Sequence, residues 1–79
     1  MIEIRLPEEL WVTRMLPEGI VERVLADDGA RVEAGQAIAE VRVGDRLHEI
    51  AAPGAGVLVW AAGAGALVEP GSLLASLRP

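Results

Sequence analysis

Few residues of this chain have side chains that could act in catalysis or bind a metal ion. His48 is the only histidine and Glu49 follows it, so a general base or a metal ligand can be considered. Adjacent strand residues point to opposite faces, and no second ligand stands at a suitable spacing, so a surface strand residue is the favoured interpretation. Asp27 and Asp28 could bind a cation but are better explained as turn residues before Gly29. We expect no catalytic residue and no metal site.

The residue types that are missing exclude whole classes of function. The 79 residues contain no cysteine, which excludes disulfides, thiolate metal sites and cysteine nucleophiles. They also contain no lysine, since all seven basic residues are arginines. The net charge is −5 and the arginines are scattered, so nucleic acid is not an expected partner. Phosphate-loop, serine-triad and metalloprotease motifs do not occur.

Short strands joined by turns are the elements expected to position these residues. Gly or Pro recurs so often that few uninterrupted segments reach helical length. Apolar residues alternate at Ile2, Ile4 and Leu6, which predicts a strand with these side chains on its core-facing side. The same pattern predicts core-facing side chains at Val57 and Val59.

An internal repeat relates two parts of the chain. Residues 28–39 recur as residues 64–75, with Gly29 matching Gly65 at an offset of 36. The glycines suit a turn with positive φ, and a valine three residues later in each copy is expected to enter the core. Two copies are too few for a solenoid. They predict two sheets related by a quasi-twofold axis.

A chain this short encloses one core, so one domain is expected over residues 1–79, with repeat halves at about 19–43 and 56–78. No segment approaches the roughly 18 uninterrupted apolar residues of a membrane span, and residues 1–6 lack the apolar stretch of a signal peptide. We expect a soluble, unprocessed, cytoplasmic chain.

Several segments, in their order and spacing, resemble the biotinyl/lipoyl carrier domain. They are residues 19–21, 28–36, 38–41 and 52–57. The opening, residues 2–7, is more similar to the lipoyl domain of the acyltransferase component of oxo-acid dehydrogenase complexes than to a biotin carboxyl carrier. The resemblance implies an all-β fold, a flattened barrel of two four-stranded antiparallel sheets with quasi-twofold symmetry, also called a barrel-sandwich hybrid.

The resemblance also implies a lysine at a hairpin tip, to which lipoate or biotin is attached. In the family this lysine stands eight residues before the proline of an Ala-Pro motif, and counting back from Pro53 reaches Asp45. Gly44 and Asp45 are predicted to form a two-residue hairpin loop, where a leading glycine fits a type II′ turn. A carboxylate cannot form the amide, and the guanidinium groups of Arg42 and Arg46 stay protonated. We therefore expect no covalently bound cofactor.

The sequence thus predicts a non-enzymatic lipoyl-like module that acts through protein contacts or as a structural domain. The resemblance implies the acyltransferase, the decarboxylase or a lipoate ligase as partners. The expected contact surface is the exposed hairpin around Val43, Gly44, Asp45 and Arg46.

The two tryptophans are the only aromatic residues. Trp60 ends an apolar strand and is expected to be partly buried. Trp11, with Leu10 and Met15, is a second candidate interaction patch. The proline and two glutamates of residues 7–10 could begin a single helical turn.

Two alternatives remain open. The chain could descend from a working swinging-arm carrier of lipoate or biotin and have lost its lysine. It could also be a spacer module of a membrane-fusion or transport adaptor, in which the same barrel needs no lysine. That barrel normally interrupts a long helical hairpin, and no heptads flank this one.

Overall fold

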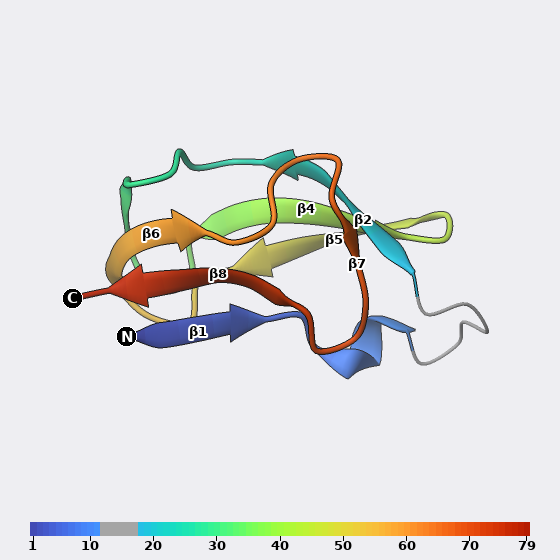
Figure 1. The fold of residues 1–79 in the computed structure, drawn as a ribbon, viewed down its shortest axis with the longest axis horizontal. Helices are drawn as coiled ribbons and strands as arrows, with labels where there is room; N and C mark the ends of the chain where they lie inside the picture. The colour runs from blue at the N-terminus through green and yellow to red at the C-terminus, as the bar shows by residue number, and fades with distance from the viewer. Residues whose placement is uncertain (12–17) are drawn as a thin grey trace.

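The computed structural model describes residues 1–11 and 18–79, which form eight strands and one 3-10 helix (Figure 1). Met15, one of the residues of the second candidate patch, lies outside these ranges. In chain order the elements are β1 (Ile2–Arg5), η1 (Glu8–Trp11), β2 (Gly19–Val24), β3 (Arg31–Val32), β4 (Ala37–Val43), β5 (Arg46–Ala51), β6 (Gly56–Trp60), β7 (Leu67–Val68) and β8 (Leu73–Arg78).

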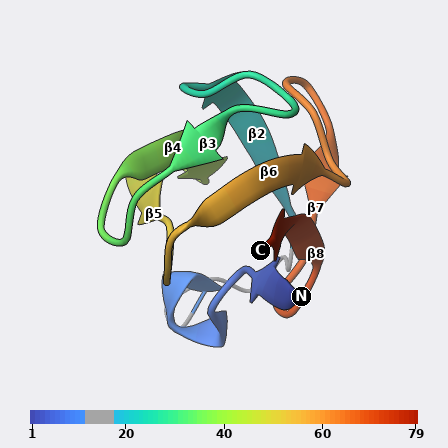
Figure 2. The same ribbon diagram turned by 90° about the vertical axis from the view of Figure 1, so that its left-hand side faces the viewer.

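The strands form two four-stranded antiparallel sheets that enclose one interior (Figure 2). The side chains buried there are apolar. Their orders are β1-β8-β6-β3 and β5-β4-β2-β7. The predicted all-β barrel-sandwich is confirmed, although the barrel is not closed, since β1 and β5 are sheet edges. The helical turn expected after Pro7 is also present, as η1.

The predicted repeat corresponds to an exchange of short strands between the sheets. β3 of the first half pairs with β6, and β7 of the second half pairs with β2. Gly29 and Gly65 both have φ of 87°, and their N–H groups donate to the carbonyl oxygens of Leu58 and Val21 at 2.7 and 2.8 Å. This left-handed backbone favours glycine. The valine that follows in each copy is buried, as predicted.

The twofold relation extends beyond the predicted repeat, to a pattern that sequence analysis missed. Glu-Ile-x-x-Pro occurs at residues 3–7 and again at residues 49–53, at an offset of 46. The N–H of Leu6 donates to Ser72 O at 3.0 Å, and the N–H of the equivalent Ala52 donates to Gln36 O at 2.8 Å. The offset changes because the segment between β1 and β2 is longer than the one between β5 and β6.

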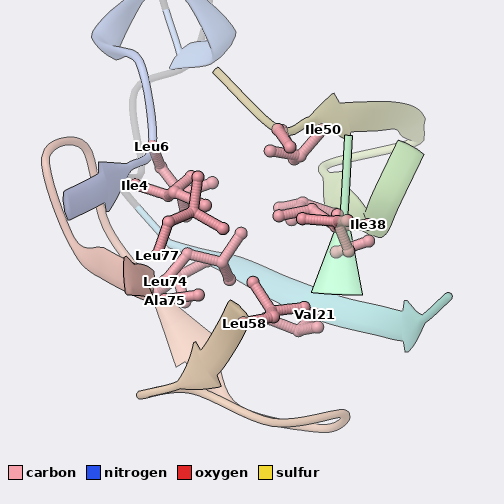
Figure 3. Close-up of a cluster of buried hydrophobic side chains, with 14 of the residues drawn as sticks. Ile4, Leu6, Val21, Ile38, Ile50, Leu58, Leu74, Ala75 and Leu77 are labelled. Atoms are coloured by element: carbon pink, nitrogen blue, oxygen red, sulfur yellow. The ribbon is translucent and has the colours of Figure 1, made fainter. Parts of the chain in front are cut away.

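The core lies between the sheets, and Figure 3 shows Ile4 and Leu6 entering it from one side and Ile38 and Ile50 from the other. Its largest fully buried side chains include Leu6, Ile38, Leu58, Leu74 and Leu77.

Two details of the predicted strand faces are wrong. Leu58 is the buried residue of β6, while Val57 and Val59 are half-buried on the outer face. Every residue from Val57 to Trp60 is apolar, so the sequence does not reveal the phase of the alternation. Ile4 and Leu6 are buried as expected, but Ile2, at the end of an edge strand, is 47% exposed.

Candidate functional site

The hairpin of β4 and β5 carries the predicted site at its tip. Val43 pairs with Arg46, which leaves Gly44 and Asp45 as the two-residue loop. Gly44 has φ of 64° and Asp45 has no positive φ, the combination expected of a type II′ turn and not of type I′. Gly44, Asp45 and Arg46 are exposed, at the end of the molecule opposite the chain termini (Figure 1).

Two residues predicted as contact residues are buried instead. Val43 is 1% exposed and Trp11 is 5% exposed, so neither side chain is available to a partner. The reason is that η1 directs Trp11 inward, against the start of β2. A Cβ placed on Gly19 would lie 3.1 Å from Cζ2 of Trp11 and 3.3 Å from Cγ2 of Val43. The indole therefore packs beside Val43, at the loop end of the hairpin, and Leu10 beside it is half-buried.

A row of four side chains, three of them apolar, lies beside the tip on the outer face of the same sheet. Cross-strand pairing places Leu47, Arg42, Ile20 and Leu67 side by side on β5, β4, β2 and β7. We call these four residues the tip-side strip. Leu47 is 45% exposed and Leu67 is 72% exposed.

A shallow groove of about 280 Å³ joins this strip to the tip. It is lined by Glu18, Gly19, Ile20, Arg42, Gly44 and Leu67. Sequence analysis missed it, because only the pairing of β2 with β7 brings Ile20 next to Leu67.

Ion pairs between β2 and β4 hold the arginine of the strip in place. The Arg42 Nε donates to Glu22 Oε1 at 2.9 Å, and the Arg23 Nε donates to Glu40 Oε1 at 2.8 Å. The Arg23 side chain is 66% exposed and the Arg42 side chain is 40% exposed, so water screens both pairs and each contributes at most about 1 kcal/mol. Their role is to orient polar groups on this face.

The other residues considered as catalytic or metal-binding candidates are His48, Glu49 and the two aspartates before Gly29. His48 pairs with Val41 on the inward side of β5 and is half-buried, while Glu49 points outward. The Asp28 Oδ1 accepts a hydrogen bond from the Trp60 N–H at 2.8 Å, which ties the turn before Gly29 to the end of β6. Within residues 1–11 and 18–79, no three His, Cys, Asp or Glu side chains are grouped as metal ligands would be.

Trp60 is partly buried, as predicted, and its indole N–H donates to the Ala26 carbonyl at 2.9 Å. Over the described residues, no helix has the length and apolar character needed to cross a membrane.

The fold is a small open barrel of two sheets that exchange short strands, with an exposed hairpin whose loop has two residues. These features define the class of biotinyl/lipoyl-type domains. A family model described as "Biotin-requiring enzyme", the biotin/lipoyl model, matches residues 3–77, and the chain belongs to this family. Domains of this family are carriers that interact with partner enzymes and are not catalysts themselves. No curated protein matches the chain.

Proposed function

We propose that this domain is a non-enzymatic docking module whose exposed hairpin tip contacts a partner protein and carries no attached lipoate or biotin. The observation that carries the proposal is a well-formed, exposed tip with Asp45 where the family has its lysine, in a chain of 79 residues without any lysine side chain. The partner is proposed to be a component of a 2-oxo acid dehydrogenase complex, in the cytoplasm.

The chemistry of attachment supports the absence of a cofactor. Lipoate and biotin are transferred from an acyl adenylate to a primary amine, and an aspartate carboxylate is not an acyl acceptor of this kind. Arg46, beside Asp45, is exposed, but a guanidinium stays protonated in proteins. The tip can therefore contact a partner through its charged side chains and its shape, but it cannot carry a lipoyl or biotinyl arm.

The surroundings of the tip support docking. The groove beside Gly44 and the tip-side strip form one continuous outer face with the loop. Exposed leucines next to an exposed hairpin provide apolar contact area, and the ion-paired Arg42 lies between them. Apolar anchors surrounded by polar groups are the usual composition of a protein interface.

The test is the intact mass of the protein after incubation with ATP, lipoate and a lipoate ligase. The unaltered chain is expected to gain no mass. Asp45→Lys is expected to gain one lipoyl group, because it places a primary amine in an exposed two-residue loop at the position where the family has its lysine. Arg46→Lys is the matched control, since its lysine is displaced by one residue and faces the other side of the strand.

Two results would overturn the proposal. A lipoyl or biotinyl group on the unaltered chain would refute the docking role without a cofactor. Equal modification of both lysine variants would show that the tip is not a specific recognition site. The docking itself is measured as binding of the unaltered chain to the purified acyltransferase or decarboxylase component, and no binding to either would refute that partner.

One alternative is favoured by a specific observation. The type II′ loop is intact even though its lysine is absent, which is what a descendant of a working carrier would retain. Rapid lipoylation of Asp45→Lys together with no binding of the unaltered chain to any complex component would favour that alternative.

A further inference from the structure

A second groove lies away from the tip, between the edge strands of the two sheets. It has a volume of about 370 Å³ and is bordered by β1 on one side and β5 on the other. Its lining is mostly apolar and consists of Glu3, Ile4, Arg5, Pro7, Leu10, Glu49, Ile50, Ala51 and Pro53.

The lining repeats the twofold relation of the fold. Glu3 corresponds to Glu49, Ile4 to Ile50, and the proline after β1 to the proline after β5. The groove therefore lies between equivalent strands of the two halves. Ile4 and Ile50 form its floor at 4% and 7% exposure, and both side chains point into the interior in Figure 3.

Both walls offer unused backbone groups to this groove. Among the described strands, β1 pairs only with β8, and β5 pairs only with β4. The Ala52 N–H donates to Gln36 O, and the Ala52 carbonyl accepts from the Gly35 N–H, in the turn before β4. Backbone groups along a strand point to alternate sides, so two residues of β5 next to the groove direct their N–H and C=O away from β4. These are Glu49 and Ala51, and Glu3 and Arg5 have the same position on β1.

The rim of the groove is acidic. Glu3 and Glu49 lie on its walls, and Glu8 and Glu9 of η1 are exposed beside Leu10. The one arginine of the lining, Arg5, is already engaged: its guanidinium bonds to Glu3 Oε1 at 3.1 Å and to Gly71 O at 3.0 Å. The unpaired charge that faces an occupant is negative.

We propose that this groove binds an extended peptide segment of a partner protein, in which apolar and basic residues alternate, as an added strand on the edge of β5. Strand addition uses the free N–H and C=O groups of a sheet edge, and alternate side chains supply specificity. The apolar side chains would cover Ile50, and the basic ones would lie across from Glu49. β5 is the favoured edge because Glu3 on β1 is already paired with Arg5, whereas Glu49 on β5 has no cation beside it in the lining.

This inference is independent of the tip, because the two grooves share no lining residue. The opposing explanation is that the glutamates protect two sheet edges from pairing, as charged residues on edge strands commonly do. The two explanations predict opposite results with a basic peptide, which a protective edge would not bind as a strand.

The probe is a short, end-blocked peptide of alternating arginine and valine, added to the ¹⁵N-labelled protein. The expected result is saturable binding with the largest amide shifts at Glu49 and Ala51. Glu49→Arg is expected to weaken binding by about tenfold or more, since it places like charges across the pair. Asp27→Arg, the same charge change on an exposed turn outside the groove, should leave binding unchanged.

Ala51→Pro separates strand pairing from general charge attraction. The substitution removes an N–H that faces the groove, and it breaks no hydrogen bond to β4. Edge strands tolerate proline where the N–H points away from the sheet. Binding should be lost while the fold is retained. Equal binding by a peptide of the same composition with all arginines before all valines, or unchanged affinity in Glu49→Arg, would overturn the proposal, and Glu49→Arg decides the matter if the proline variant does not fold.

Discussion

Gly19 and Gly56 occupy equivalent positions at the starts of β2 and β6, and both are required by close packing. A Cβ on Gly19 would lie 3.1 Å from the Arg42 carbonyl oxygen. A Cβ on Gly56 would overlap the carbonyl oxygen of Arg78, which is the twofold equivalent of Arg42. The glycine that begins each apolar strand thus allows a neighbouring strand to approach.

Gly56→Ala should therefore destabilise the domain by about 1–3 kcal/mol, the usual cost of overpacking a filled site. Gly63→Ala is the control, because a Cβ there has no neighbour within 4 Å. The control should change the free energy of unfolding by less than about 1 kcal/mol. Urea denaturation measures both, and equal midpoints for the two variants would contradict this account.

Single residues also show where sequence reasoning stops. The loop at Gly44 and Asp45 could be predicted because hairpin loop chemistry is local. The burial of Trp11 could not, because it depends on η1 packing beside Gly19 and Val43, a contact between elements that no local pattern reveals. An aromatic residue in an irregular segment has no local pattern that tells an interior position from a surface one.

At the scale of elements, the strands and the repeat were predictable, and the faces were predictable only in part. Glycine turns such as the one at Gly29 recur with their valines and identify the halves. A continuous apolar strand such as β6 carries no alternation, so its inner face was misassigned. The tip-side strip depends on β7 pairing with β2, a long-range contact that no local signal reveals.

The strip makes a prediction that uses the symmetry of the sheets. Arg31 is the twofold equivalent of Leu67, so an arginine is already accommodated at that strand position. Leu67→Arg should keep the melting temperature and weaken binding to the proposed partner, a dehydrogenase-complex component, by about tenfold, as expected for loss of an interface anchor. Leu25→Arg, on a leucine exposed outside the strip, should leave affinity unchanged. Equal affinities for the two variants, measured by calorimetry, would exclude the strip from the interface.

At the scale of the whole molecule, the domain is elongated, with extents of 37 × 18 × 18 Å. Ile2 pairs with Leu77, so both chain ends lie at one end of the long axis and the tip lies at the other (Figure 1). A protein attached at the termini would leave the hairpin free to meet a partner.

The adjacent ends also predict that the chain tolerates circular permutation. Joining Pro79 to Met1 through a two-residue turn, with new termini between Gly44 and Asp45, cuts an exposed loop and preserves every strand pair. The permutant should unfold cooperatively, with a loss of at most about 2 kcal/mol, and should no longer bind through the tip. Circular dichroism during urea denaturation measures this. A permutant without a cooperative transition would show that the covalent tip is needed for folding.

The exchange of strands between the sheets has a consequence for how the two halves of the chain assemble. Divided at the β4–β5 hairpin, each half places two strands at the edges of the sheet whose central strands the other half builds: β1 and β3 flank β8 and β6, and β5 and β7 flank β4 and β2. This is the arrangement of two chains that have swapped elements. The present chain thus has the geometry of a swapped dimer whose two subunits are joined covalently through the β4–β5 hairpin. Neither half has a complete sheet without the other, so two separately expressed halves should fold only when mixed.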